Sequence, residues 1–319
     1  MLVSLNGQLV PAERAQVSAF DRGFIFGDGV YEGLRAVRLA PGASGHVIGM
    51  NRHIRRLAEG LAACRIEWDA RQLGPLTHEL LAANELADAF IYWQVTRGTP
   101  PIIDGRPVRS RVPVAGVALQ PTVFGYCLPH AGLEKDETQG PALKRISLRP
   151  DERWHLGHIK STSLLGNIIA SMSGAAAAGN EGVDETVLVR NGLITEGTYS
   201  NVAFVLPCHR SRASDFDAPA RTTPEHQYEV VTPSLDAAPI LNGITRQILL
   251  ELEPSIVQRA VRVEEVAQAR EIMLWGTTTM VSSVTHVDGK AVDTGPVARR
   301  LNDLLLKNIR QGTDHSENV

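Results

Sequence analysis

The sequence has few of the features that mark several large classes of protein. Its 319 residues include only three cysteines, Cys64, Cys127 and Cys208, which lie far apart. This number and spacing argue against a disulfide framework or a zinc ribbon, and they favour the reducing cytoplasm. No apolar run approaches the roughly 20 residues of a membrane-spanning helix, and the opening MLVSLNGQLVPAER does not have the pattern of a signal peptide.

An excess of charge of one sign is also missing. The formal net charge is -3, so neither nucleic acid nor a membrane surface is expected as a partner. Hydrophobic residues make up 43% and charged residues 21%, which is typical of a soluble globular protein with a large core in one domain or two. These properties favour a protein that acts on small molecules.

Several common catalytic and binding motifs are absent as well. There is no HExxH zinc motif, no GxSxG nucleophile elbow and no Walker A loop. The glycines of GDGVYEG, Gly27, Gly29 and Gly33, are spaced one residue too far for a dinucleotide-binding loop. His155 and His158 have no evident third partner, so no metal site is predicted.

Periodicity and turn residues predict strands and helices in alternation, which indicates an α/β (α+β) fold. Asn6-Gly7 and Asn191-Gly192 each fit the tight turn of a hairpin. Apolar residues at helical spacing predict helices in residues 46–66, after Lys160 and in residues 243–253. The predicted strands are residues 88–98, 112–128, 142–148, 185–195, 201–206 and 270–289.

Polar segments indicate where the chain divides. Residues 129–141, PHAGLEKDETQGP, contain Pro and Gly among polar residues, so we expect an interdomain linker there. It would join a small N-terminal α/β domain, residues 1–128, to a larger C-terminal domain, residues 142–319. A second polar segment, residues 207–228, is expected to be a loop.

Lys160 stands at the edge of an almost purely apolar segment, HIKSTSLLGNIIASMSGAAAAG, residues 158–179. A lysine in such a place is often a solvated residue whose stem covers apolar surface. A nucleophilic lysine instead needs a partly apolar pocket that makes its uncharged amine available. The residues after Lys160 could provide that pocket, so Lys160 is the candidate catalytic residue.

Three other segments each have a functional and an ordinary interpretation. Glu196 follows a strand, where a carboxylate is either a surface residue or the partner of a protonated ring nitrogen. Gly243 precedes a helix whose first N–H groups form either a plain cap or an anion site. Gly276 and Thr277 follow a strand and either end it or offer an amide and a hydroxyl to a phosphate group.

Taken together and in order, these segments resemble the class IV (fold type IV) pyridoxal-phosphate aminotransferases. The motifs are RGFIFGDGVYEGLR, HIRRL, IKSTSLLGN, TEGTYSN, ILNGITR and GTTTMVSSV, and they span nearly the whole chain. The resemblance implies two domains with pyridoxal 5'-phosphate in the cleft between them, and a homodimer. It also implies ping-pong transfer of an amino group from a small-molecule donor to a 2-keto acid acceptor.

The resemblance further implies a role for each matching residue. Lys160 corresponds to the Schiff-base lysine, Glu196 to the partner of the pyridine nitrogen, and Arg56 to the phosphate-binding arginine. The other cofactor-binding residues would be Ser200, Asn201, Leu241, Gly243, Ile244, Thr245, Gly276 and Thr277. The substrate-binding residues would be Tyr31, Tyr92, Arg97 and Arg35.

The family pattern is mixed at the positions that select the substrate. Leu165 stands where branched-chain enzymes usually have a tyrosine, which is closer to the D-amino-acid enzymes. The arginine and histidine with which D-amino-acid enzymes usually hold the substrate carboxylate are missing, because Ile102 and Asp104 occupy those places. We therefore expect a D-amino-acid aminotransferase with an atypical carboxylate site.

Several alternatives remain at this point. Besides Arg97 and Arg35, Arg106 or Arg109 could bind the carboxylate, although each loop arginine could equally be a solvated residue. A branched-chain L-amino-acid transaminase and an (R)-amine transaminase have the same fold, as does a lyase of the aminodeoxychorismate type. A small-molecule binder without catalysis is the alternative from another class.

Overall fold

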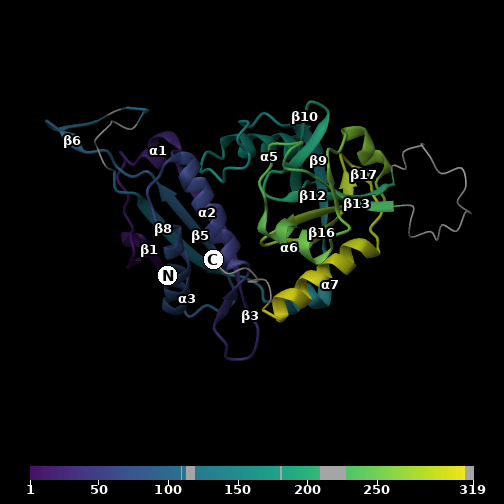
Figure 1. Ribbon diagram of the computed structural model, residues 1–319, viewed down its shortest axis with the longest axis horizontal. Coiled ribbons are helices and arrows are strands. Elements are labelled where there is room, and N and C mark those ends of the chain that lie inside the picture. Colours follow the sequence, from purple (N-terminus) through teal and green to yellow (C-terminus); the bar gives the residue numbers. More distant parts are fainter. Residues whose placement is uncertain (109, 113–118, 180–181, 209–227, 313–319) are drawn as a thin grey trace, which may run out of the picture. The chain divides into compact units, whose positions relative to one another are not determined.

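The computed structural model describes residues 1–108, 110–112, 119–179, 182–208 and 228–312. These residues form two compact units, each built around its own β-sheet (Figure 1). Unit 1 comprises Met1–Thr138, His158–Leu165 and Leu306–Val319, and unit 2 comprises Gln139–Gly157 and Gly166–Leu305. Lys160 therefore belongs to unit 1 and Glu196 to unit 2. The domain boundaries expected from the sequence stay a prediction.

Unit 1 is built on an antiparallel sheet with the strand order β2-β1-β8-β5-β3-β4. The hairpin predicted at Asn6-Gly7 is confirmed, because β1 pairs with β2 and both turn residues have positive φ, 52° and 77°. The strands are β1 (Leu2–Leu5), β2 (Gln8–Pro11), β3 (Gly29–Arg38), β4 (Gly45–Val47), β5 (Ala89–Thr96) and β8 (Thr122–Pro129). A separate small hairpin consists of β6 (Ile102–Ile103) and β7 (Arg106–Pro107).

Two helices cover one face of this sheet (Figure 1). They are α2 (Met50–Cys64), which confirms the helix predicted in residues 46–66, and α3 (Leu73–Ala83). Successive residues of a strand point to opposite faces, so Ile91, Trp93 and Val95 of β5 enter the core together with Leu57 and Leu80 from the helices. The residues between them in β5 are half-buried and lie on the other face.

The expected linker contains a helix that the sequence pattern did not predict. Residues 133–139 form α4 (Leu133–Gln139), of which only Leu133 is buried. A helix with one buried residue has no apolar stripe, and therefore no 3.6-residue signal in its sequence. A short helix, α1 (Arg22–Phe26), precedes β3 and is capped by the Asp21 side chain.

Unit 2 contains a larger mixed sheet with the order β11-β10-β9-β16-β15-β12-β13-β14. The Asn191-Gly192 hairpin is confirmed between β10 and β11, again with positive φ at both residues. The strands are β9 (Ala142–Pro150), β10 (Glu185–Arg190), β11 (Leu193–Gly197), β12 (Asn201–Pro207), β13 (Tyr228–Pro233), β14 (Val257–Arg259), β15 (Glu271–Gly276), β16 (Met280–Val287) and β17 (Lys290–Ala291). The helices are α5 (Leu165–Ala178), which enters unit 2 at Gly166, α6 (Ile244–Leu252), and α7 (Pro296–Arg310), which belongs to unit 2 as far as Leu305.

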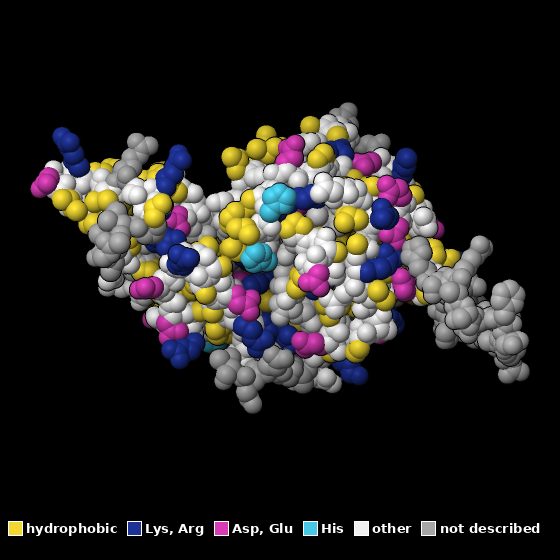
Figure 2. All heavy atoms as spheres, turned by 45° about the horizontal axis from the view of Figure 1, so that its top comes forward, with side chains coloured by type: hydrophobic (Ala, Val, Ile, Leu, Met, Phe, Trp, Pro, Cys, Tyr) yellow, Lys and Arg dark blue, Asp and Glu magenta, His cyan; other side chains and the backbone are white. Residues whose placement is uncertain are grey.

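Part of two predictions lies outside the described residues. The strand expected in residues 112–128 is confirmed from Thr122 onward as β8, and residues 113–118 are not described. Of the loop expected in residues 207–228, residues 209–227 are not described. The face drawn in Figure 2 carries acidic and basic side chains interspersed, as the small net charge predicts. In the part of the chain that the structure describes, no helix is long and apolar enough to cross a membrane.

Candidate active site

Lys160 lies in a connection that runs beside the start of β3. Its carbonyl oxygen accepts a hydrogen bond from the Tyr31 N–H at 2.9 Å, and the next residue, Ser161, forms a bridge with Val30. The Lys160 Nζ lies 4.3 Å from the centroid of the Tyr31 ring, and the lysine is half-buried. The helix expected to follow Lys160 is present but begins only at Leu165, as α5. Lys160 is thus positioned by a strand edge rather than by a helix.

Arg56 projects from α2 onto a buried carboxylate, Glu32 of β3. Its Nε and Nη2 donate to the two Glu32 oxygens at 2.8 and 2.6 Å, and His53 Nδ1 lies 2.6 Å from the same carboxylate. Burial acts to raise the pKa of Glu32, but the charges and hydrogen bonds of Arg56 and His53 outweigh it and lower the pKa to about 2. Burial lowers the pKa of His53, and the positive charges of Arg56 and Lys160 lower it further, against the opposing effect of Glu32.

The sequence did not identify Glu32 or His53 as site residues. The only signal was a glutamate inside a strand, where a buried charge requires a partner. Glu32 holds the Arg56 guanidinium in one orientation by two parallel bonds. The phosphate-binding role of Arg56 itself stays a prediction.

The two tyrosines predicted to line the substrate site come together in unit 1. Tyr31 and Tyr92 stack with ring centroids 5.6 Å apart and an interplanar angle of 26°. The Tyr92 hydroxyl donates to Gln94 Oε1 at 2.9 Å. Burial raises the pKa of Tyr92, so this hydroxyl stays protonated and acts as a donor.

The two candidate arginines have internal partners. Arg97 forms two bonds with the Asp28 carboxylate, at 2.8 and 2.9 Å, and its other donors reach the carbonyls at the end of α2. Arg35 is fully buried and donates to Asp136 of α4 at 2.6 Å and to the Ala131 carbonyl at 3.0 Å. These contacts anchor the loop after β5 and helix α4, respectively. A substrate-binding role for either arginine stays a prediction.

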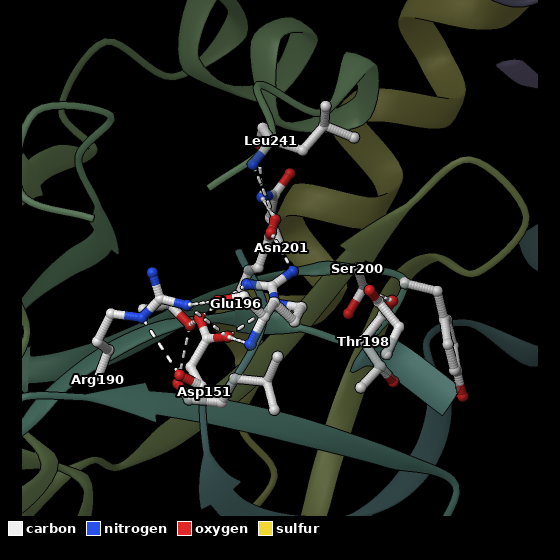
Figure 3. Close-up of polar contacts among 12 residues, drawn as sticks. Asp151, Arg190, Glu196, Thr198, Ser200, Asn201 and Leu241 are labelled. Atoms are coloured by element: carbon white, nitrogen blue, oxygen red, sulfur yellow. Dashed lines mark hydrogen bonds and ion pairs between the residues drawn. The ribbon is translucent and has the colours of Figure 1, made fainter. Parts of the chain in front are cut away.

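Glu196, in unit 2, is a buried carboxylate fixed on both oxygens (Figure 3). Its Oε1 accepts from Arg153 Nη1 at 2.8 Å. Its Oε2 accepts from the Leu241 N–H at 3.0 Å and from Asn201 Nδ2 at 3.3 Å. Hydrogen bonds from charged and neutral donors favour the ionised form of a carboxylate.

Arg153 connects Glu196 to a second buried carboxylate, Asp151. Asp151 and Glu196 are labelled in Figure 3. Asp151 also accepts from the Thr195 hydroxyl at 3.0 Å and pairs with Arg190 at 3.0 Å. Burial acts to raise the pKa of Asp151, but these partners, Arg153 above all, lower it. The sequence had no local signal for this network, because bonded partners in it are separated by up to 44 residues.

Three of the residues predicted around the cofactor phosphate, Gly243, Ile244 and Thr245, lie at the start of α6. Gly243 precedes the helix with extended φ and ψ of -63° and 141°, and no side chain among the described residues caps the helix. A Cβ added at Gly243 would lie 2.1 Å from Asn201 Oδ1, so only glycine allows this approach. The first N–H groups of α6, on the buried residues Ile244 and Thr245, are of the kind that binds anions.

Gly276, where β15 ends, is a second glycine against which other residues pack closely. A Cβ added there would lie 2.7 Å from Thr279 Oγ1 and 3.7 Å from Ser200 Cβ. The Thr279 hydroxyl is buried and has no hydrogen-bond partner within the ranges that the structure describes. Thr277, in the turn between these two residues, is half-buried. Ser200 lies close to Gly276, and the next residue, Asn201, lies close to Gly243. These two consecutive residues therefore connect the two glycines.

Glu185 holds the turn between β11 and β12, in which Ser200 lies. Its Oε1 accepts from the N–H groups of Tyr199 and Ser200, both at 3.0 Å. Burial raises the pKa of Glu185 to about 7, although both N–H groups act to lower it. Glu185 was not identified from the sequence.

Comparison with known proteins identifies the family. The model of the amino-transferase class IV family matches residues 29–287. The chain belongs to the class IV aminotransferases. Over 98% of its length it is 30% identical to the D-alanine aminotransferase of Bacillus licheniformis, 99% of which is covered. It is 28% identical to the D-alanine aminotransferase of Staphylococcus haemolyticus, over 96% of this chain and 97% of that protein.

Solved structures show the same fold. A branched-chain aminotransferase from Thermoproteus uzoniensis, solved with norvaline, has a TM-score of 0.77 at 23% identity, covering 98% of this chain and 95% of that one. A hypothetical aminotransferase from Mycobacterium tuberculosis, solved in a PLP-bound form, has a TM-score of 0.71 at 19% identity, covering 96% and 97%. The two-domain fold type IV architecture expected from the motifs is thereby confirmed.

Class IV aminotransferases are pyridoxal-phosphate enzymes, and unit 2 of this aminotransferase contains groups that fit such a cofactor. The start of α6 and the buried Thr279 hydroxyl are donors suited to a phosphate. Glu196 is an acceptor suited to a protonated ring nitrogen, and the glycines at 243 and 276 keep both places free of side chains. The chain is therefore an enzyme, and the alternative of a binder without catalysis is excluded by family membership.

Proposed function

We propose that this chain transfers the amino group of a D-amino acid to a 2-keto acid by a ping-pong mechanism with pyridoxal 5'-phosphate as cofactor. The choice of D-amino acids rests on the D-alanine aminotransferases to which the chain is similar along its whole length. Leu165, at the position of the tyrosine usual in branched-chain enzymes, supports the same choice.

The observation that carries the cofactor assignment is the Glu196 carboxylate, held on both oxygens in a buried position. Pyridoxal phosphate, when bound, supplies the electron sink for the bond that breaks at the donor's α-carbon. Glu196 would hold a proton on the pyridine nitrogen, and the hydrogen bonds from Arg153 and Asn201 orient its carboxylate for that task. The start of α6, Gly276, Thr277 and Arg56 would bind the phosphate.

Lys160 is the group we propose for proton transfer. Its Nζ would remove the proton from the α-carbon of the donor as a general base and would return it to the aldehyde carbon of the cofactor. The Tyr31 ring beside Nζ limits the positions that the amine adopts and covers one side of it. The interdomain location of the cofactor stays a prediction, as does the cytoplasmic location.

A homodimer is also part of the proposal. Leu165, Ile168, Ile169 and Met172 are 51–67% exposed and follow one another at helical spacing on α5. Exposed apolar stripes of this kind mark interaction surfaces, and a second copy of the chain is the partner that the family resemblance implies. Sedimentation equilibrium of wild type and Met172→Glu tests this point, with a shift of the variant toward the monomer expected.

The test of function is a donor panel with purified, cofactor-loaded protein. We expect a yellow protein whose colour bleaches with D-alanine or D-glutamate and returns with pyruvate or 2-oxoglutarate. Parallel lines in double-reciprocal plots would identify the ping-pong order. Turnover of L-leucine or (R)-1-phenylethylamine in preference to every D-amino acid would replace the proposed donor. Release of pyruvate from aminodeoxychorismate, with no amino acceptor present, would indicate a lyase.

Lys160→Ala tests the catalytic assignment directly. The variant should lose the covalently bound chromophore and nearly all turnover, because no other lysine is proposed to form the bond. A variant that retains full rate would show that the assignment of Lys160 is wrong.

A further inference from the structure

Arg246, in the first turn of α6, is a buried arginine whose hydrogen-bond partners are all uncharged. It is 1% exposed. Its Nη1 donates to Asn242 Oδ1 at 3.2 Å, and its Nη2 donates to the Pro233 carbonyl at 3.1 Å and to Gln258 Oε1 at 2.9 Å. Its Nε is buried and has no hydrogen-bond partner within the described ranges of the chain. A buried cation with only neutral acceptors beside it is unfavourable unless an anion compensates its charge.

The guanidinium of Arg246 keeps its charge at neutral pH in spite of its burial. Burial lowers the pKa of Arg246 to about 10, and the negative charge of Glu196 acts in the opposite direction. A group with this pKa is almost wholly protonated at neutral pH. The charge of Glu196 is already shared, because Glu196 and Asp151 together pair with Arg153 and Arg190, two negative side chains with two positive ones. Arg246 is a positive charge in excess of that network.

The side chain of Arg246 is directed back toward the start of its own helix. Helix α6 begins at Ile244, yet Nη1 of Arg246 reaches Asn242, which precedes the helix. The Arg246 Cβ also lies 3.8 Å from the place that a Cβ at Gly243 would take. The start of a helix carries a partial positive charge, so acidic rather than basic residues are favoured in its first turn. The first turn of α6 contains no acidic residue.

Three sources of positive potential therefore meet at this place: the helix dipole, the first N–H groups of α6 and the Arg246 guanidinium. They oppose one another electrostatically, and a doubly negative group in front of the helix would stabilise all three. A neutral group in the same position would stabilise none of them. The phosphate of the cofactor is such an anion, whereas its ring substituents do not carry a comparable negative charge.

We infer that the buried charge of Arg246 stabilises the phosphate group of the bound cofactor and so makes the site select pyridoxal 5'-phosphate over pyridoxal. This inference rests on the proposed cofactor. Arg246 acts here as a positioning residue without needing to touch the phosphate, because a charge inside a protein acts over several ångströms. The competing explanation is that Arg246 only ties α6 to β13 and β14 through Pro233 and Gln258.

The experiment compares the dissociation constants of pyridoxal 5'-phosphate and pyridoxal, measured by absorbance titration of the enzyme freed of cofactor. In Arg246→Gln, which removes the charge but keeps hydrogen-bonding groups, the ratio of the two constants should fall by about tenfold or more. Arg246→Lys keeps the charge and should retain most of the ratio. A residue that only ties α6 to the strands would, when changed, weaken both forms of the vitamin equally and leave the ratio unchanged.

A second measurement uses inorganic phosphate as the probe and needs no bond to Lys160. An anion that binds only the folded protein raises its Tm. The Tm of the cofactor-free wild type should rise with phosphate concentration beyond the effect of sodium chloride at equal ionic strength. This rise should be smaller in Arg246→Gln, and Arg246→Met, a second neutral variant, should behave in the same way.

The matched control is Arg259→Gln. It removes another arginine of unit 2, one that is paired with the carboxylates of Glu229 and Glu265. Both the ratio of dissociation constants and the effect of phosphate on Tm should remain as in the wild type. Circular dichroism shows which variants are folded, and the folded neutral variant is the one compared with Arg246→Lys.

The outcomes separate this inference from the function on which it rests. An unchanged ratio in a folded neutral variant, or an equal loss in Arg246→Lys and Arg246→Gln, overturns the inference and leaves the cofactor assignment intact. A wild type that binds neither pyridoxal 5'-phosphate nor pyridoxal overturns the proposed function. An equal effect of phosphate on the Tm of the wild type and of the neutral variants would then still decide against Arg246.

Discussion

One guanidinium group, that of Arg153, holds two buried carboxylates at once. Its Nη1 donates to Glu196 Oε1 at 2.8 Å, while Nε and Nη2 donate to the two oxygens of Asp151 at 2.9 and 3.0 Å. The side chains of Arg153, Glu196 and Asp151 are 10%, 7% and 0% exposed. The negative charge of Glu196 thus depends on a residue that is remote in sequence and that no motif indicated.

Replacement of Arg153 by Met should destabilise the fold strongly. Glu196 would lose the Arg153 cation, and Asp151 would keep only Arg190 of its two partner cations. Breaking a buried ion pair from one side costs about 3–5 kcal/mol. Urea unfolding measures this loss, and fluorescence titration with pyridoxal phosphate should show weaker cofactor binding. The control is Arg71→Met, which breaks a pair in which Arg71 is 78% exposed and should have little effect. Equal stability of the two variants would contradict the role given to Arg153.

Glu32→Gln should change how stability depends on acid pH. The pKa of Glu32 is lowered from 4.5 to about 2 in the folded state, so its charge contributes stability above the unfolded pKa. That contribution is lost as the pH falls from about 4.5 toward 2. Glu32→Gln should therefore have a lower free energy of unfolding than wild type near neutral pH. The difference between the two proteins should become smaller in acid. Circular dichroism during urea unfolding at several pH values measures it, with Glu59→Gln on the exposed side of α2 as the control.

Glu185→Gln should have the opposite dependence. Burial raises the pKa of Glu185 to about 7, so the protonated form is favoured on folding. Its stabilising contribution is complete below the unfolded pKa of about 4.5 and is lost as the pH rises through about 7. Gln keeps an acceptor for the Tyr199 and Ser200 N–H groups without the charge. We expect the variant to gain stability relative to wild type as the pH rises from 4.5 past 7. A difference in free energy of unfolding that does not change with pH would contradict the raised pKa of Glu185.

Gly243→Ala tests whether the close packing of Asn201 against Gly243, at the start of α6, matters for cofactor binding. The φ of -63° is suitable for alanine, so the backbone is not strained. The added methyl group would meet Asn201 Oδ1 at 2.1 Å and displace the side chain that bonds to Glu196 and to the Leu241 carbonyl. We expect cofactor affinity to fall by about tenfold or more, which is the loss typical when a residue that orients a direct ligand of a bound group is changed. The control, Gly74→Ala on α3, meets only Ile54 Cδ1 at 3.9 Å and should leave affinity unchanged.

Elements with a strong local signal could be predicted from the sequence. The Asn-Gly hairpins at residues 6–7 and 191–192 were predictable because those residues tolerate positive φ, and α2 because its buried residues repeat at helical spacing. Helix α4 was missed because it buries only Leu133. The start of α5 was placed too early because Ser and Thr after Lys160 bond to the backbone at Gly27 and Gly29 instead of entering the helix.

Only those residues of the candidate site that belong to sequence motifs could be predicted. The motifs indicated Glu196, Gly243 and Gly276, which unit 2 brings together around Ser200 and Asn201. They did not indicate what holds the charged residues. The partners of Arg35 and Arg97 are 101 and 69 residues away in the chain, and no local pattern predicts such pairs. This is why both arginines could be taken for substrate ligands.

Strand β3 carries two different surfaces on its alternating residues. Glu32 and Leu34 face the helices, while Tyr31 and Gly33 belong to the opposite side. Insertion or deletion of a single residue between Gly29 and Arg38 would exchange the two sets, placing a carboxylate among the tyrosines and an aromatic ring against Arg56. Length differences among homologous chains should therefore be confined to the loops on either side of this strand, whatever donor each homologue uses.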